Sequence, residues 1–112
     1  VGTINKQAVA FLEQNGVESV SRADIGCGLG CYGQGELSLE EVYNLAMKAD
    51  DPKAQAIVLS CTDMRSVEVI EKIEKDLGKP VVTSNQAMMF CVYKKFGLLR
   101  QSNLQGCLFD RL

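Results

Sequence analysis

Apolar side chains recur at helical spacing in several segments of the chain, and short apolar runs separate these segments. The expected helices cover residues 5–14, 38–50, 65–77 and 86–96. The third helix places four apolar residues in register, namely Val67, Ile70, Ile73 and Leu77. This spacing predicts amphipathic helices that pack one face on a core, except for the last helix, which is apolar on most sides.

Local signals indicate where the expected helices begin and end. Ser38 and Glu41 form a capping box, in which the Ser38 hydroxyl accepts from the Glu41 amide and the Glu41 carboxylate reaches back. Ser84 is placed to cap the last helix. Three of the helices are followed by glycines that act as stops, at Gly16, Gly78 and Gly97.

The apolar runs between the helices predict strands at residues 17–25, 56–60 and 80–82, and the tail from residue 98 is expected to be irregular. The run 56–60 is wholly apolar up to its last residue, as in parallel strands covered on both faces. The alternation of helices and strands predicts an α/β fold, a three-layer parallel sheet with helices on both faces. Because such domains normally open on a strand and this chain opens on a helix, we expect the leading strand to be missing. Residues 1–112 are then a single α/β domain that is a fragment.

Composition narrows the classes of function. A chain of 112 residues is long enough for one domain. A net charge of −2 and a pI near 5.1 argue against a nucleic-acid surface, which requires clustered basic residues. The chain has no apolar run of the ~18 residues that a membrane span needs, and no signal peptide opens it. We therefore expect a cytoplasmic protein that binds neither membranes nor nucleic acid.

Polar residues whose side chains can bind a ligand or take part in a reaction follow two of the expected strands. Cys61, Thr62 and Asp63 come after the strand 56–60, and Ser84 and Asn85 come after the next strand. In an open parallel sheet, ligands bind beyond the carboxyl ends of the strands, and adjacent parallel strands end at the same edge. Each segment leads into a helix N-terminus, which favours anions, thiolates included. The pattern predicts a site for a small carboxylate beside a reactive thiol.

Each of these residues also has a purely structural interpretation. Cys61 at the end of an apolar strand can be a packing residue, and Asp63 can be a helix cap whose charge would repel a carboxylate. Ser84 by itself is most simply an N-cap, and Arg65 is most simply a solvated residue of the first turn. Since the sequence contains no histidine, a Cys-His pair or a Ser-His-Asp triad within this chain is excluded.

The remaining cysteines do not form an obvious site. Cys27 and Cys31 would need two distant thiols to complete a zinc site, so no metal is expected. Cys91 lies in an apolar run and is interpreted as a small core residue, whereas Cys107 in the tail carries no signal. Residues 28–33 spell G-x-G-x-x-G, but further residues intervene before the next helix, which argues against a nucleotide. We interpret this glycine-rich segment as a mobile loop near the site.

The longer stretch of sequence around these residues resembles a known family. The stretch IVLSCTDMRSVEVIEKIEKDLGKPVVTSNQA, residues 57–87, is similar to the second half of the maleate cis-trans isomerase and arylmalonate decarboxylase group of the aspartate/glutamate racemase superfamily. The similarity extends upstream through INKQAVAFLEQNGVESV and GQGELSLEEVYNLA, and so covers nearly the whole chain. Its specificity lies in combining Ser-Cys-Thr-x-x-Arg-Ser with Leu-Gly-Lys-Pro-Val-x-Thr-Ser-Asn-Gln-Ala.

The resemblance implies a flavodoxin-like half of an enzyme built from two similar α/β halves, with the active site between them and no metal or organic cofactor. A cysteine from each half flanks a small dicarboxylate in that superfamily. By this likeness Cys61 is the catalytic cysteine of the second half, and the substrate-binding residues are Thr62, Asp63, Ser84 and Asn85. The position of Asp63 is commonly Asn in the isomerases, which leaves the exact substrate open.

The resemblance favours the isomerase branch and predicts cis-trans isomerisation of maleate to fumarate. A racemase or a decarboxylase of the same superfamily is the alternative within the enzyme class, and a non-catalytic α/β binding module with structural thiols is the alternative outside it. The first half with its own cysteine, and a strand ending in Thr-Pro-Tyr, are not in this chain. We therefore expect the chain alone to be inactive. Its expected partners are the missing N-terminal half, a small dicarboxylate, or a second copy in a homo-oligomer.

Overall fold

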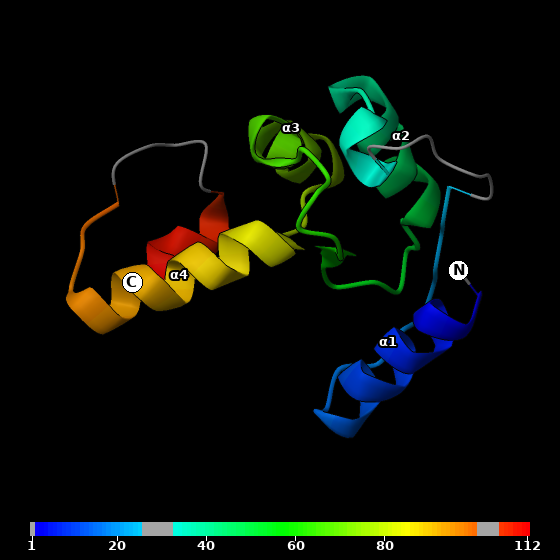
Figure 1. The fold of residues 1–112 in the computed structure, drawn as a ribbon, viewed down its shortest axis with the longest axis horizontal. Coiled ribbons are helices and arrows are strands. Elements are labelled where there is room, and N and C mark those ends of the chain that lie inside the picture. The colour runs from blue at the N-terminus through cyan, green and yellow to red at the C-terminus, as the bar shows by residue number, and fades with distance from the viewer. Residues whose placement is uncertain (1, 26–32, 101–105) are drawn as a thin grey trace.

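The structure is a computed structural model that describes residues 2–25, 33–100 and 106–112. Figure 1 shows the order of its elements along the chain. These are α1 (Gly2–Gln14), η1 (Gly33–Glu36), α2 (Leu39–Ala49), β1 (Ile57–Leu59), α3 (Val67–Leu77), β2 (Val81–Thr83), α4 (Ser84–Phe96) and η3 (Cys107–Arg111). The η elements are single turns of 3-10 helix. Among the described residues, no helix is long and apolar enough to cross a membrane.

The strands β1 and β2 lie side by side and run parallel, with α3 as the crossover between them. Ile57 pairs with Val81 and Leu59 pairs with Thr83, and all of these side chains are buried. This face of the sheet packs on α2 and α3, and the core is a cluster of Val42, Ala46, Ile57, Leu59, Met64, Val69, Ile70, Ile73 and Val81. The expected α/β fold with a parallel sheet is confirmed.

The opposite face of the sheet is much less covered. Val58, between the two buried residues of β1, is 48% exposed. Figure 1 shows α2 and α3 on one side of the strands and α1 and α4 on the other, so helices occupy both sides. However, α4 leaves apolar side chains in solvent, namely Met88, Met89, Val92 and Phe96. The expectation that β1 is covered on both faces was therefore wrong at Val58, because neither α1 nor α4 seals it.

Most of the predicted helix ends are confirmed. The Ser38 hydroxyl accepts from the Glu41 amide at 3.1 Å, and the Ser38 amide donates to the Glu41 carboxylate at 2.8 Å. Gly78 and Gly97 close α3 and α4 at φ values of 64° and 66°, in the left-handed region. The observed start of α1 at Gly2 lies a few residues before the expected one.

The cap of α4 differs from the prediction. Thr83, and not Ser84, is the N-cap: its hydroxyl accepts from the Gln86 amide at 3.1 Å, and the Gln86 side chain accepts from the Thr83 amide at 3.0 Å. Ser84 is instead the first helical residue. Because β2 runs directly into α4, its last residue is also the cap of the helix, and the pattern of polar residues alone does not show this shift.

Two predictions about apolar residues were wrong. Residues 17–25 form no strand, since no described segment pairs with them, and Val17 and Val20 remain exposed. A strand needs a neighbour to receive its backbone hydrogen bonds. In α3, Val67 is 46% exposed and Val69 is buried instead, because α3 begins only at Val67 and turns that residue away from the sheet.

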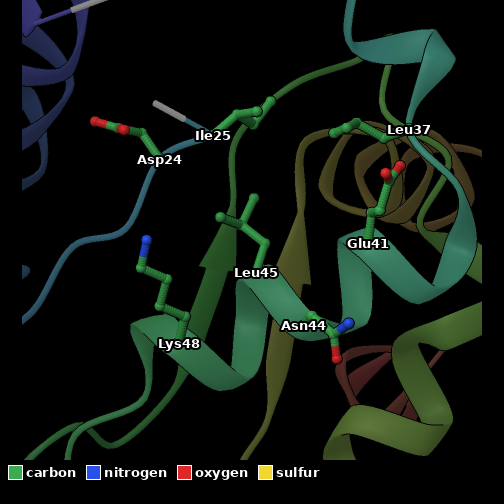
Figure 2. A pocket seen from close by; sticks show the side chains of 7 residues that line it. All are labelled: Asp24, Ile25, Leu37, Glu41, Asn44, Leu45 and Lys48. Carbon is green, nitrogen blue, oxygen red and sulfur yellow. The ribbon is translucent and has the colours of Figure 1, made fainter. Parts of the chain in front are cut away.

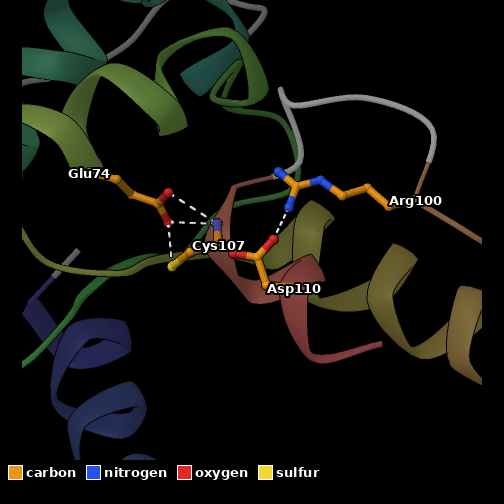
Figure 3. Close-up of polar contacts among 4 residues, drawn as sticks. All are labelled: Glu74, Arg100, Cys107 and Asp110. Atoms are coloured by element: carbon orange, nitrogen blue, oxygen red, sulfur yellow. Dashed lines mark hydrogen bonds and ion pairs between the residues drawn. The ribbon is translucent and has the colours of Figure 1, made fainter.

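The tail was expected to be irregular, but its described end forms the turn η3. Phe109 is buried there and packs edge-on against Phe90 and Tyr93 of α4, with ring centroids 5.7 and 5.3 Å away. The same turn contacts β2, and its first residue bonds to Glu74 of α3 (Figure 3). The tail therefore fixes α4 against α3 and the sheet, because it touches all of these elements.

Candidate functional site

The two segments expected to carry the chemistry lie beside each other at one edge of the sheet. Leu59 and Thr83, the last residues of β1 and β2, are paired, so residues 60–63 and the start of α4 follow at the same edge. The Nδ2 atom of Asn85 donates a hydrogen bond to the carbonyl oxygen of Thr62 at 2.8 Å. The proximity predicted from strand order is therefore present, and a side chain joins the two segments directly.

Cys61 lies at the boundary between the core and this edge. Its side chain packs against the hydrophobic cluster below β1, and the residue is half-buried with a free thiol. The packing interpretation is thus correct in part, because the cysteine covers the end of the core. The residue as a whole is nevertheless only half-buried, which is compatible with a chemical role as well as with packing.

The other predicted site residues differ in how far they are buried. Thr62 and Asp63 are exposed, whereas Ser84 and Asn85 are half-buried in the first turn of α4. Asp63 is not the cap of α3, since that helix begins after Ser66, whose side chain makes no capping bond. The backbone of Asp63 lies next to η1, where a Cβ atom added to Gly35 would stand 3.6 Å from the Asp63 carbonyl oxygen.

The turn η1, into which the glycine-rich segment leads, thus lies beside the strand-end loop. The G-x-G-x-x-G stretch, the interpretation of a mobile loop, and Cys27 and Cys31 fall on residues 26–33, almost all of which lie outside the described residues. Within the described part of the chain, no group of three or more Cys, Asp or Glu side chains could hold a metal ion.

The N-terminus of α4 can bind an anion. The first amides of a helix have no acceptor within the helix, and the helix dipole is positive at this end. Thr83 takes the Gln86 amide with its hydroxyl, while the amides of Ser84 and Asn85 begin the helix at the edge where Cys61 lies. Among the described residues, the first turn of α4 contains no acidic side chain that would oppose a bound carboxylate.

Arg65 occupies the position that its structural interpretation predicted. Its guanidinium is exposed and pairs with the Glu68 carboxylate at 3.0 Å, three residues along the chain. The hydrogen bond from Arg65 lowers the pKa of Glu68 from its ordinary value, with a smaller contribution from the backbone. This arrangement makes Arg65 a solvated partner of the first turn of α3.

The remaining described thiols differ sharply from one another. Cys91 is exposed on α4, so the prediction of a core residue was wrong: Met88, Met89 and Val92 of the same helix are exposed as well. Cys107 is half-buried, and its sulfur donates to the Glu74 carboxylate at 3.1 Å. Burial raises the pKa of Cys107 above its ordinary value, and the hydrogen bond to Glu74 raises it further.

A hollow of about 230 Å³ lies away from these residues, between residues 24–25 and one side of α2 (Figure 2). Apolar side chains from both walls meet the hollow, and polar groups surround it. It is lined by Asp24, Ile25, Leu37, Glu41, Asn44, Leu45 and Lys48. None of the predicted site residues lines this hollow, so it does not mark the candidate site.

A comparison of the chain with known protein families identifies its family. A family model described as arylmalonate decarboxylase matches residues 1–109. The chain belongs to the arylmalonate decarboxylase family. No curated protein sequence matches the chain at a significant level.

Solved structures of arylmalonate decarboxylase share the fold of this family member. The crystal structure of arylmalonate decarboxylase superposes with a TM-score of 0.87 at 24% identity, over 100% of this chain and 50% of that chain. The unliganded form of arylmalonate decarboxylase superposes with a TM-score of 0.88 at 23% identity, again over 100% and 50% of the two chains. This member of the family therefore spans about half the length of those enzymes.

The group named from the sequence motifs is thus confirmed at the level of the family. Sequence reasoning placed Cys61, Thr62, Ser84 and Asn85 at one edge, and the structure brings them there. It missed the bond between Asn85 and Thr62, because a link between the side chain of a helix residue and the backbone of a distant loop leaves no periodic signal in a sequence.

Proposed function

We propose that this chain supplies one half of the active site of a cofactor-independent enzyme that acts on a small dicarboxylic acid. The observation that carries the proposal is the position of Cys61, a free thiol at the sheet edge beside the N-terminus of α4. Membership in the arylmalonate decarboxylase family supports the same chemistry. In this role Cys61 holds or moves a proton at the carbon next to a carboxylate.

The substrate carboxylate is proposed to bind where the amides of the strand-end loop and of α4 converge. Amides near Thr62, Ser84 and Asn85 supply donors whose orientation is fixed before the substrate arrives. The exposed Asp63 carboxylate repels an anion from the solvent side of the loop. It therefore favours a binding pose in which the charged groups point toward α4.

The family match favours decarboxylation among the reactions open to such a site. The bond between the substrate carbon and one carboxylate breaks, CO2 leaves, and its electron pair remains on the substrate as an enediolate. The Cys61 thiol then donates its proton to that carbon, and water reprotonates the resulting thiolate. A racemase uses the same proton transfer without loss of CO2.

The sequence motif around Cys61 favours maleate isomerisation. A thiolate from the complementary half adds to one alkene carbon, and the π electrons move into the neighbouring carboxylate as an enediolate. Rotation about the new single bond follows, and expulsion of the same thiolate yields fumarate without any gain or loss of atoms. Here Cys61 stabilises the enediolate from the opposite side of the ligand.

The partner in this proposal is the complementary α/β half, which brings the second cysteine. The solved relatives contain about twice the matched length, which leaves room for such a half. The exposed apolar residues of α4 and Val58 provide surface that a partner domain can cover. A homo-oligomer would cover the same surface with a second copy.

Alkylation of the thiols tests the proposal on the chain itself. Peptide mass spectrometry resolves the rates of Cys61, Cys91 and Cys107 toward iodoacetamide at neutral pH, with and without maleate or phenylmalonate. We expect the dicarboxylate to slow alkylation of Cys61 only, while exposed Cys91 serves as the internal control. Equal rates at Cys61 with and without either acid would favour the non-catalytic binding module.

The reaction itself requires the chain assembled with its complementary half. Proton NMR in D2O then separates the candidates, because maleate yields fumarate, whereas phenylmalonate yields phenylacetate with deuterium at the central carbon. We expect Cys61→Ala to lower the rate by roughly 100-fold or more, as for loss of a general acid. Retention of full activity in that variant would exclude Cys61 from the chemistry.

A further inference from the structure

Asn85 is the described side chain that joins the two strand-end segments, and its Nδ2 atom donates to the Thr62 carbonyl at 2.8 Å. We infer that Asn85 is a positioning residue, which acts on the site through the backbone of Thr62. The inference rests on the proposed function, since it concerns the same anion-binding edge. It changes the role expected for Asn85 from a direct substrate contact to the residue that orients the loop of Cys61.

The anchor point of this bond is rigid. Asn85 belongs to the first turn of α4, directly after the capping box that Thr83 forms with Gln86. Thr83 and Gln86 are only 2% and 5% exposed, so the base of the helix is fixed by the core. In the loop from residue 60 to 66, Met64 and Ser66 are held in the core, whereas Thr62 is exposed and lies outside both β1 and α3.

The bond fixes more than one atom. Because the peptide unit is planar and trans, holding the Thr62 carbonyl toward Asn85 turns the Asp63 amide N–H in the opposite direction. It also keeps the Thr62 carbonyl oxygen, which would repel a carboxylate, occupied by a donor. Without Asn85 this oxygen is free to rotate toward the bound anion, and the Cys61–Thr62 backbone loses its fixed orientation.

Substitutions at Asn85 separate the hydrogen bond from its surroundings. Asn85→Ala removes the donor, and Asn85→Asp keeps the shape but places a carboxylate against the Thr62 carbonyl at neutral pH. Protonation of that carboxyl at acid pH restores a donor, so Asn85→Asp recovers the bond as the pH falls and Asn85→Ala does not. Asn44→Ala, at an exposed residue of α2 far from the loop, is the matched control.

Hydrogen exchange of peptides that cover residues 60–66 reports the loop directly. We expect Asn85→Ala to speed exchange of these amides roughly five-fold over the wild type, the effect of one lost hydrogen bond. Peptides from α3 and the Asn44→Ala variant should stay unchanged, which separates loop loosening from global unfolding. For Asn85→Asp, the ratio of the loop exchange rate to that of the wild type should fall toward one at pH values below the titration range of the introduced carboxyl. Unchanged loop exchange in Asn85→Ala, or no recovery of Asn85→Asp at low pH, overturns the inference.

Ligand protection separates this inference from the proposed function. In the alkylation assay, we expect Asn85→Ala to raise the maleate concentration that half-protects Cys61 roughly five-fold, with Asn44→Ala matching the wild type. An unchanged concentration despite faster loop exchange overturns the positioning role. If maleate and phenylmalonate fail to protect wild-type Cys61, the proposed function fails, whereas the exchange experiment still decides whether Asn85 orders the loop.

Discussion

Glu74 makes several polar contacts outside the candidate site. Its carboxylate accepts from the Cys107 amide at 3.0 Å and from the Cys107 sulfur at 3.1 Å (Figure 3). It also accepts from the Val81 amide at 3.0 Å. A single half-buried carboxylate thereby joins α3, the start of β2 and the tail. Arg100 and Asp110 form an ion pair nearby, also drawn in Figure 3, which closes the tail on its outer side.

The contact with Glu74 predicts an unreactive thiol at Cys107. Its pKa is raised by burial and by the hydrogen bond to Glu74, so the thiolate forms at higher pH than in an ordinary cysteine. At neutral pH we expect Cys107 to alkylate several-fold more slowly than exposed Cys91. Glu74→Gln removes the negative charge and should speed Cys107, with Glu71→Gln, an exposed residue of the same helix, as the control. Equal rates for Cys107 and Cys91 in the wild type would contradict this prediction.

Tyr43, Lys72 and Asp76 form an exposed cluster between α2 and α3 that predicts a specific titration. Tyr43 donates to Asp76 at 2.6 Å, and Lys72 donates to the same carboxylate at 2.8 Å. The bond to Asp76 raises the pKa of Tyr43, while Lys72 first and Tyr43 second lower the pKa of Asp76.

In an ultraviolet titration, Tyr43 should ionise above the ordinary tyrosine range, and Asp76→Asn should return its pKa toward that range. Because the pKa of Asp76 is depressed on folding, its contribution to stability is present above the ordinary carboxyl pKa and is lost as pH falls through the folded value. A Tyr43 titration that is the same in Asp76→Asn and in the wild type would show that the cluster does not form in solution.

At the scale of elements, Gly106 controls how η3 meets α3 and α4. Its φ of 74° and ψ of 175° lie in a region that essentially only glycine adopts. A Cβ at this position would stand 2.6 Å from Cγ2 of Ile70 and 2.8 Å from Nε2 of Gln86. The tail can therefore enter between the two helices only without a side chain.

Gly97→Ala is the reference variant for Gly106→Ala. Gly97 has a φ of 66° with no atom within 4 Å of an added Cβ, so its substitution measures backbone strain alone, about 1–2 kcal/mol. Gly106→Ala adds the clash and the cost of a backbone region that is harder for alanine to adopt, and should lower the free energy of unfolding by about 1–3 kcal/mol more. Urea denaturation measures both variants, and equal losses would mean that the tail moves aside at little cost.

At the scale of the whole molecule, the sheet is covered well on one face and poorly on the other. The core lies between the strands and α2 and α3, whereas the side of α4 leaves apolar side chains in solvent. The exposed set includes Val58, Met88, Met89, Val92, Phe96 and Leu99. Surface of this kind marks an interface or leads to association.

We therefore expect the isolated chain to self-associate in a concentration-dependent way. Val92→Lys, in the middle of the exposed side of α4, should reduce association in sedimentation velocity and leave the unfolding midpoint nearly unchanged. Lys75→Glu, on the solvent-exposed side of α3, is the control for a change of charge and should not alter association. Unchanged association in Val92→Lys would place the interface elsewhere.

The sequence by itself determined the features that depend on neighbours along the chain. The Ser38–Glu41 capping box, the glycine stops and the α3 residues Ile70 and Ile73 follow from short spacings, because these interactions close within one or two helical turns. The expected proximity of the segments after β1 and β2 also followed, since adjacent parallel strands end at the same edge.

Tertiary structure alone decided which apolar residues are buried and which side chains join distant segments. Residues 17–25 were predicted to be a strand but have no pairing partner among the described residues, and Cys91 follows an apolar run but lies on an exposed side of α4. The bonds from Asn85 to Thr62 and from Glu74 to Cys107 depend on the packing of elements far apart in the chain. Burial and long-range bonds are properties of the assembled surface, and a local pattern contains no information on what covers it.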